Sequence, residues 1–259
     1  MNDLSDMIWI EFRKAIRSRI PLWTALGSLF IPFGIAFLIF VSKNPEISQK
    51  LGVVSAKADL MAFAATDWPS YLGLYGQLIA AGGFFLFVLI ISWVFGREFT
   101  DGTLKDLLAV PVKRSGILLA KFILVAVWSV LMTQVILIAG LIMGAIIKIP
   151  EYSTNGIFQG FGLIMITAGM TVAVIMPFAL IASMGRGYLL PMGVAVLTLM
   201  TTNLAMILGW GKYFPWAIPG LYAQAKSSLA PISYWIVFLT GLAGMVATYL
   251  WWKSADQSR

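Results

Sequence analysis

Six apolar segments, each long enough to cross a bilayer, limit the fold of this chain more than any other feature. A transmembrane helix needs about 20 predominantly apolar residues, and a backbone inside lipid must satisfy its own polar groups. Of the residues, 60% are hydrophobic and 11% charged, against about 45–50% and about 25% in soluble domains. The sequence therefore predicts an all-α integral membrane protein, one transmembrane domain over residues 1–259, with spans at about 20–41, 73–95, 117–147, 157–184, 189–209 and 232–252. Pro177 predicts a kink in the fourth span.

The residue types that are missing exclude most enzyme chemistry. The chain has no cysteine and no histidine, which removes thiolates, the commonest metal ligand and the usual general base. It has no Gly-x-x-x-x-Gly-Lys-Ser/Thr phosphate loop, and no Asp, Glu or His lies within a predicted span. We therefore predict no catalytic residue, cofactor or metal in this chain, and an energy source for any transport that lies outside the bilayer. The net charge of +7 fits Lys and Arg at cytoplasmic helix ends better than a nucleic-acid partner.

The distribution of Lys and Arg predicts the orientation of the spans. An even number of spans puts both termini on one side of the membrane. Twelve of the 18 Lys and Arg residues fall at the termini or loops of that side, and six fall on the other. Because cytoplasmic loops carry an excess of Lys and Arg, we predict that both termini and the polar segment 96–116 are cytoplasmic. Segments 42–72 and 210–231 are then outside.

Residues 3–19 have the pattern of an amphipathic helix that precedes the first span. Apolar residues recur at helical spacing, at Leu4, Met7, Ile8, Phe12, Ala15 and Ile16. Such a helix lies in the membrane interface, where Arg17 and Arg19 are expected to anchor it. Glu11 falls within the apolar stripe. Either Glu11 lies at an exposed edge, or it pairs with a basic residue of the bundle, for which we favour Arg97.

The polar segment 96–116 is longer than a simple turn between two spans requires. Thr100 or Asp101 can cap a short helix, and Pro111 ends it. Its apolar ridge at helical spacing consists of Leu104, Leu107 and Leu108. Lys113 and Arg114 are expected at the membrane surface, and Lys121, near the end of the third span, is expected to snorkel towards it. The segment is either an ordinary interfacial loop or a docking surface for a partner outside the bilayer.

Four groups of residues in this region resemble the loop between spans two and three of ABC-2-type transporter permeases. They are Gly96-Arg-Glu98, Asp101-Gly-Thr-Leu104, Pro111-Val-Lys-Arg114 and Ile117-Leu-Leu-Ala-Lys121. The N-terminal helix, with Glu11-Phe-Arg-Lys14, is similar to the interfacial elbow helix of that family. Two further segments resemble the subgroup of bacitracin-resistance and lantibiotic-immunity permeases. They are Asp67-Trp68 and Phe214-Pro-Trp-Ala-Ile-Pro219.

The resemblance implies partners and site residues. In that family the permease does not hydrolyse ATP. Two permease subunits, identical or homologous, pair, and each docks a separate ATPase, which binds ATP and Mg²⁺, through a coupling helix in this loop. A re-entrant-like outer segment between spans five and six is also implied. The residues implied to couple to the ATPase are Glu98, Asp101, Gly102, Thr103, Leu104 and Leu107.

Three functions stay open on this basis. We favour a permease subunit in a bacterial cell membrane that exports or clears an amphiphilic or lipid-like compound, with an antimicrobial peptide as the favoured cargo. Its many aromatic and Met residues suit such a cargo. The alternatives are an ABC-type exporter of ions or small molecules, and a non-transporting membrane sensor or scaffold that recruits a cytoplasmic partner. The sequence assigns no residue to cargo binding.

Overall fold

The computed structural model describes residues 3–44, 67–103, 113–150, 153–225 and 229–254. Every regular element in these ranges is helical, which confirms the predicted all-α class. In chain order the elements are α1 (Asp3–Arg17), α2 (Ile20–Ser28), α3 (Phe30–Lys43), α6 (Trp68–Leu78), the π-helical turn η2 (Ile79–Gly83), α7 (Phe84–Thr100), α9 (Arg114–Ile146), α10 (Thr154–Ile175), α11 (Pro177–Met184), α12 (Leu189–Ile207), the 3₁₀ turn η3 (Gly211–Tyr213), α13 (Ile218–Ala225) and α14 (Pro231–Ser254).

Six helical stretches of the described chain are long and apolar enough to cross a membrane, as the sequence predicted. They are Ile20–Val41, Trp68–Thr100, Arg114–Ile146, Thr154–Met184, Leu189–Ile207 and Pro231–Ser254. The second differs most from its predicted bounds of 73–95. It starts earlier because Asp67 Oδ1 accepts a hydrogen bond from Ser70 N at 2.9 Å and so caps α6. It also continues to Thr100, which brings charged residues into the helix.

Three of the spans are interrupted. The first is divided at Leu29, the second contains η2, and the fourth is divided at Met176. The kink predicted at Pro177 is therefore confirmed, since proline has no N–H to continue the helical hydrogen bonds. Gly244 of α14 lies against this break, where a Cβ would collide with the backbone of Pro177. The two spans consequently pack closely at the kink.

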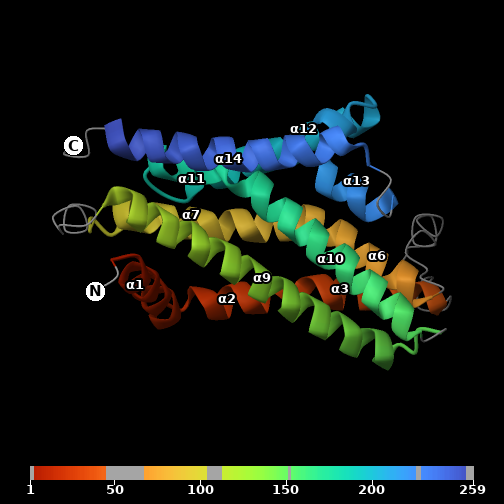
Figure 1. Ribbon diagram of the computed structural model, residues 1–259. Helices are drawn as coiled ribbons and strands as arrows, with labels where there is room; N and C mark the ends of the chain where they lie inside the picture. The colour runs from red at the N-terminus through yellow and green to blue at the C-terminus, as the bar shows by residue number, and fades with distance from the viewer. Residues whose placement is uncertain (1–2, 45–66, 104–112, 151–152, 226–228, 255–259) are drawn as a thin grey trace.

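The helices form an elongated bundle with two distinct ends (Figure 1). Helix α1, the last turn of α7, the first turn of α9 and the last turn of α14 lie at one end, which we call the α1 end. The first turn of α6, the last turn of α9 and α13 lie at the opposite end, which we call the α13 end. This arrangement agrees with six alternating spans.

Helix α7 lies in the apolar centre of the bundle. Phe87, Ile91 and Phe95 are fully buried, and they share one core cluster with Val125 of α9 and Phe178 of α11. Burial of one such side chain stabilises the fold by about 1.5–3 kcal/mol relative to its exposure to water. Because α7 is surrounded by other helices, any charged side chain near its end must find partners within the protein.

The outer segment between α12 and α14 contains η3 and α13. Ile218 and Tyr222 of this segment are buried in a cluster with Met170 and Val174 of α10. Trp216 Nε1 also donates to Val174 O at 2.9 Å. The segment is thus held against the bundle by a short helix, and its re-entrance into the bilayer stays a prediction.

Candidate functional site

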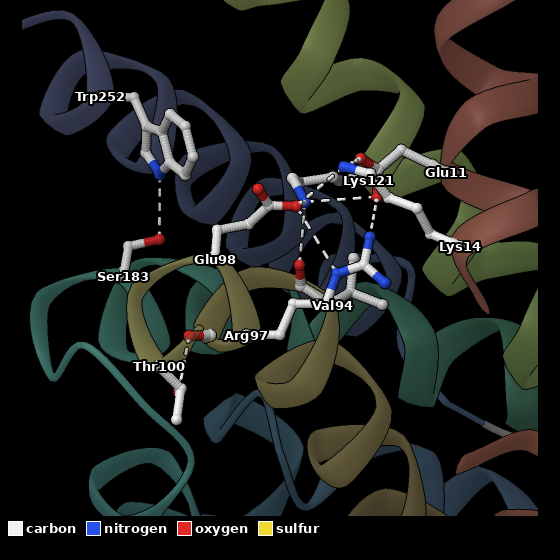
Figure 2. A network of polar contacts seen from close by, with 10 residues as sticks. Glu11, Lys14, Val94, Arg97, Glu98, Thr100, Lys121, Ser183 and Trp252 are labelled. Carbon is white, nitrogen blue, oxygen red and sulfur yellow. Dashed lines mark hydrogen bonds and ion pairs between the residues drawn. The ribbon is translucent and has the colours of Figure 1, made fainter. Parts of the chain in front are cut away.

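Five charged side chains meet where α1, α7 and α9 come together at the α1 end (Figure 2). Arg97 Nη2 lies 3.0 Å from Glu11 Oε2, and Arg97 Nε lies 3.5 Å from Glu98 Oε1. Lys121 Nζ lies 3.0 Å from Glu98 Oε1 and 3.3 Å from Glu11 Oε2. Lys14 Nζ lies 3.1 Å from Glu11 Oε1 and 3.2 Å from Glu98 Oε1. We call these five residues the charge cluster.

The charge cluster is buried, and its formal charges do not cancel. The relative exposure is 0% for Lys121, 2% for Glu98, 3% for Glu11 and 7% for Arg97. Only the Lys14 side chain, at 36%, is substantially exposed. Three cations face two carboxylates, which leaves one positive charge in excess. Removing each ion from water costs several kcal/mol, and only close partners offset that cost, so the cluster strongly favours one arrangement of α1, α7 and α9.

Apolar packing brings α1 to the seam between α7 and α9. Met7 of α1 packs with Ile117 and Ala120 of α9. Glu11 follows Met7 by one helical turn on the same face, so it arrives at the seam beside the other charges. Ala15, one turn further, is 3% exposed and joins the central core. Met7, Glu11 and Ala15 therefore face protein, whereas Leu4 and Ile16 of the same stripe are exposed.

Helix α7 supplies two neighbouring members of the charge cluster, Arg97 and Glu98. The Arg97 guanidinium lies 4.5 Å from the centroid of the Trp93 ring, a cation–π contact that covers its flat face. Lys121 Nζ donates to Val94 O at 3.1 Å as well as to Glu98. These contacts tie the last turns of α7 to α9 just before the chain leaves the bundle.

The sequence profile of the ABC-2 family transporter protein matches residues 7–203, a range that includes the whole charge cluster. The chain belongs to the ABC-2 transporter family. It is also 24% identical over 176 residues to the bacitracin transport permease protein BCRB of Bacillus licheniformis, across 66% of this chain and 84% of that protein. The resemblance to ABC-2-type permeases of the bacitracin-resistance subgroup is confirmed. This ABC-2 protein is accordingly a multi-pass membrane subunit of an ABC transporter, and its family implies an ABC ATPase as partner.

Two acidic residues singled out in the sequence of this ABC-2 protein lie in one cluster. Glu11 contacts Arg97, the partner favoured for it, at 3.0 Å. Glu98 was implied to face the ATPase, but it lies among three cations and is 2% exposed. Its carboxylate offers no outer surface in this arrangement. Any part that Glu98 plays in coupling therefore acts through the cations that hold it.

Sequence reasoning missed the roles of Lys14 and Lys121. The expectation that Lys121 snorkels to the membrane surface is wrong, since its side chain turns into the bundle and is fully buried. The physical reason is that Glu11 and Glu98 place two carboxylates within reach of its ammonium group. A signal was present, because Lys121 and Glu98 are charges of opposite sign at the facing ends of consecutive apolar helices.

The other residues implied to couple to the ATPase lie at or beyond the end of α7. Asp101, Gly102 and Thr103 are exposed. Gly102 has a φ of 69°, in the left-handed region that glycine adopts without a steric penalty. Leu104 and Leu107 lie outside the described residues. The exposed stretch therefore begins directly after the helix that carries the charge cluster.

The four basic residues predicted to anchor the chain at the membrane surface are exposed; they are Arg17, Arg19, Lys113 and Arg114. Arg114 Nη1 also donates to Trp252 O at 2.7 Å. This hydrogen bond links the first turn of α9 to the last turn of α14.

Other elements close around the last turn of α7. The Phe99 ring packs edge-on against Trp252, at 6.0 Å between centroids, and Trp252 Nε1 donates to Ser183 Oγ at 3.0 Å. A Cβ on Gly96 would lie 3.1 Å from the backbone of Gly187, so the turn before α12 approaches α7 closely. The last turn of α7 thus contacts α1, α9, α14 and the turn before α12.

The chemistry of the site is electrostatic. Within the described part of the chain, no group of three or more His, Cys, Asp or Glu residues is placed to hold a metal ion. Both carboxylates of the charge cluster are occupied by cations from two or more helices. Such ion pairs hold helices in position and can exchange partners when a helix moves.

Proposed function

We propose that this chain is the membrane subunit through which a separate ABC ATPase drives the clearance of an amphiphilic antimicrobial peptide from a bacterial cell membrane. ATP and Mg²⁺ would be bound by that ATPase, and a second permease subunit, identical or homologous, would complete the transporter. Membership of the ABC-2 family and similarity to a protein named for bacitracin transport support the proposal.

The charge cluster is the observation that carries the coupling part of the proposal. The exposed stretch that starts at Asp101 begins three positions after Glu98, where α7 ends at Thr100. Because Glu98 is bound to Lys121 of α9 and Lys14 of α1, a force applied to this stretch is passed to spans two and three and to α1. An ATPase that binds the stretch after α7 would therefore move several helices together. A soluble partner gains access to a membrane subunit only through surface of this kind.

The orientation that we propose places the α1 end in the cytoplasm. By sequence position, twelve of the 18 Lys and Arg residues belong to the termini and loops predicted on this side of the membrane. The stretch that follows α7 and both ends of the chain then face the ATPase, whereas α13 lies at the outer surface.

An open hollow at the α13 end is the cargo surface that we propose. It has a volume of about 320 Å³, and its lining includes Leu163 and Ile166 of α10, Tyr222 of α13, and Gln159 as an amide group. Ligand sites are typically apolar with a few polar groups that fix orientation. A hollow of this size would hold one side chain or a short lipid tail of an amphiphilic peptide rather than the whole molecule.

The proposed function is tested by antibiotic resistance in living cells. The chain is expressed with an ABC ATPase that co-purifies with it in a bacitracin-sensitive bacterium, and the bacitracin concentration that stops growth is measured. We expect this concentration to rise only when both proteins are present. The matched control replaces the phosphate-loop lysine of the ATPase, which should abolish resistance without changing the amount of either protein.

The alternatives give different outcomes in the same strains. Unchanged tolerance to bacitracin and other amphiphilic peptides, with ATP hydrolysis stimulated by an ion or a small polar molecule, would favour the exporter of such compounds. Resistance that persists with the inactive ATPase would contradict ATP-driven transport and favour a sensor or scaffold.

A further inference from the structure

The face of α1 that is turned away from the charge cluster carries a basic and aromatic hollow. Its volume is about 290 Å³, and it is lined by Trp9, Ile10, Arg13, Lys14 and Arg17. Residues 9, 13 and 17 follow one another at a spacing of four, so they form one row along the helix. The Arg13 guanidinium lies 4.7 Å from the centroid of the Trp9 ring. The lining therefore combines three cations with an aromatic wall and includes no carboxylate.

Lys14 joins this hollow to the charge cluster. An ammonium group has three N–H donors, and within the described chain Lys14 gives hydrogen bonds to Glu11 and Glu98. A third donor is available towards the hollow that Lys14 also lines. Because the charge cluster has one positive charge in excess, a negative group in the hollow would neutralise it. The electrostatics thus favour an anion at this position.

The surroundings of the hollow fit lipid better than an aqueous partner. Trp9 is 59% exposed, Ile10 45% and Ile16 75%, and the first span continues this surface with Leu22 at 61% and Trp23 at 64%. Large apolar side chains next to a membrane span are stable when they lie against acyl chains, and Trp is enriched at the membrane interface. Long Arg side chains from such a helix reach the headgroup layer. The soluble ATPase offers no comparable apolar medium.

We propose that this hollow binds the headgroup phosphate of an anionic phospholipid. Arg13 and Arg17 donate to the phosphate oxygens, for which the guanidinium fork is well matched. Lys14 contacts the same phosphate from the charge cluster, and an acyl chain lies along Trp9 and Ile16. The site is separate from the cargo surface, and it depends only on α1 lying at the membrane surface. A bound lipid would hold α1 in the position that the charge cluster requires.

The experiment measures lipid-dependent thermal stability of the full chain in detergent, with phosphatidylglycerol or phosphatidylcholine added at equal concentrations. We expect phosphatidylglycerol, but not phosphatidylcholine, to raise the unfolding temperature of the native sequence with a saturable dose response. In the double variant Arg13→Gln/Arg17→Gln the apparent affinity for phosphatidylglycerol should fall roughly 30-fold, because each lost cation contributes about 1 kcal/mol of attraction to an anionic surface. The control Lys253→Gln removes an exposed cation at the same end and should leave the response unchanged.

Three further variants make the test decisive. Arg13→Lys/Arg17→Lys retains both charges and should retain most of the response. If the double Gln variant does not fold, Arg13→Gln and Arg17→Gln alone should each weaken the apparent affinity about fivefold. An equal response to both lipids, or an unchanged response in the Gln variants, overturns the proposal. A variant that keeps the lipid response but loses the ATPase in co-purification also overturns it, and assigns this face of α1 to the ATPase.

Discussion

Lys121 Nζ on α9 lies 3.0 Å from Glu98 Oε1 on α7, and the two residues are 0% and 2% exposed. Each charge allows the other to be buried, because an unpaired ion at this depth would strongly destabilise the fold. The pair joins the last turn of the second span to the start of the third, on either side of the segment implied to dock the ATPase.

The first prediction concerns the charge balance of the cluster. Glu98→Gln leaves one carboxylate for three cations in the charge cluster, whereas Lys14→Gln leaves two carboxylates for two cations. We expect Glu98→Gln to lower the free energy of unfolding by about 3–5 kcal/mol, and Lys14→Gln, at a partly exposed position, by about 1 kcal/mol or less. Thermal unfolding of both variants in the same detergent checks this. Equal losses would mean that the excess positive charge has no energetic effect.

The second prediction concerns the attachment of α1. Glu11→Gln removes the carboxylate that α1 offers to Arg97 and Lys121, so the amide hydrogens of residues 3–17 should exchange faster with solvent. Asp6→Asn makes the same charge change on the same helix, outside the charge cluster, and should leave exchange unaltered. Mass spectrometry of α1 peptides measures both. Identical exchange in the two variants would show that apolar packing alone holds α1.

The third prediction concerns the docking surface after α7. Leu104→Arg places a charge on the predicted apolar ridge and should weaken co-purification of the ATPase, because burial of an unpaired charge is costly. Folding should be unaffected, since residue 104 follows the second described span, which ends at Thr100. Lys113→Gln, also between spans two and three, serves as the control and should keep normal binding. Normal binding by Leu104→Arg would place the docking surface elsewhere, with α1 as the next candidate.

The fourth prediction concerns the hollow at the α13 end. Gly162 lines it, and a Cβ at Gly162 would meet no atom within 4 Å. Gly162→Leu should therefore extend a side chain into the hollow and lower bacitracin resistance while the protein accumulates normally. Gly169 lies on the same helix outside this lining and has equal room for a Cβ, which makes Gly169→Leu the matched control. Both changes gain helix propensity of about 1 kcal/mol, so a difference in resistance reports on the hollow. Equal resistance would exclude it as the cargo surface.

The fifth prediction concerns orientation. The chain has no cysteine, so cysteines introduced at Lys113 and Lys212 are the only targets for a membrane-impermeant thiol reagent. We expect labelling of intact cells at position 212 and not at position 113. The reverse pattern would invert the proposed topology and move the ATPase partner to the α13 end.

The helical class and the six spans followed from local sequence patterns. Runs of about 20 apolar residues have few stable alternatives to a membrane-spanning helix. Pro177 interrupts such a helix because its ring leaves no backbone N–H to donate, which is a property of that residue alone. The early start of the second span also had a local cause in Asp67, a standard helix cap, which its apolar window did not include.

The site was only partly predictable. Glu11 was recognisable as a charge on an apolar stripe, and such a residue needs a partner. The sequence did not show that Glu98 turns inward, because a glutamate near the end of a span has the same local pattern whether it faces the ATPase or the bundle. It also did not show how the hollow on α1 is connected, since Lys14, which lines it, meets Glu98 of α7 only in the folded bundle.

The sequence by itself determined which segments are helices and which face of α1 is apolar, because both properties depend on residues within a few turns of one another. Only the tertiary structure decided the charge cluster. Lys121 and Glu11 are 110 positions apart in the chain. No repeat in the local sequence pattern predicts that two such distant residues lie close together in space. Their ion pair exists because the packing of α1 on α9, and of α9 on α7, brings the middle of α1 and the facing ends of α7 and α9 to one buried point where charges of opposite sign must meet.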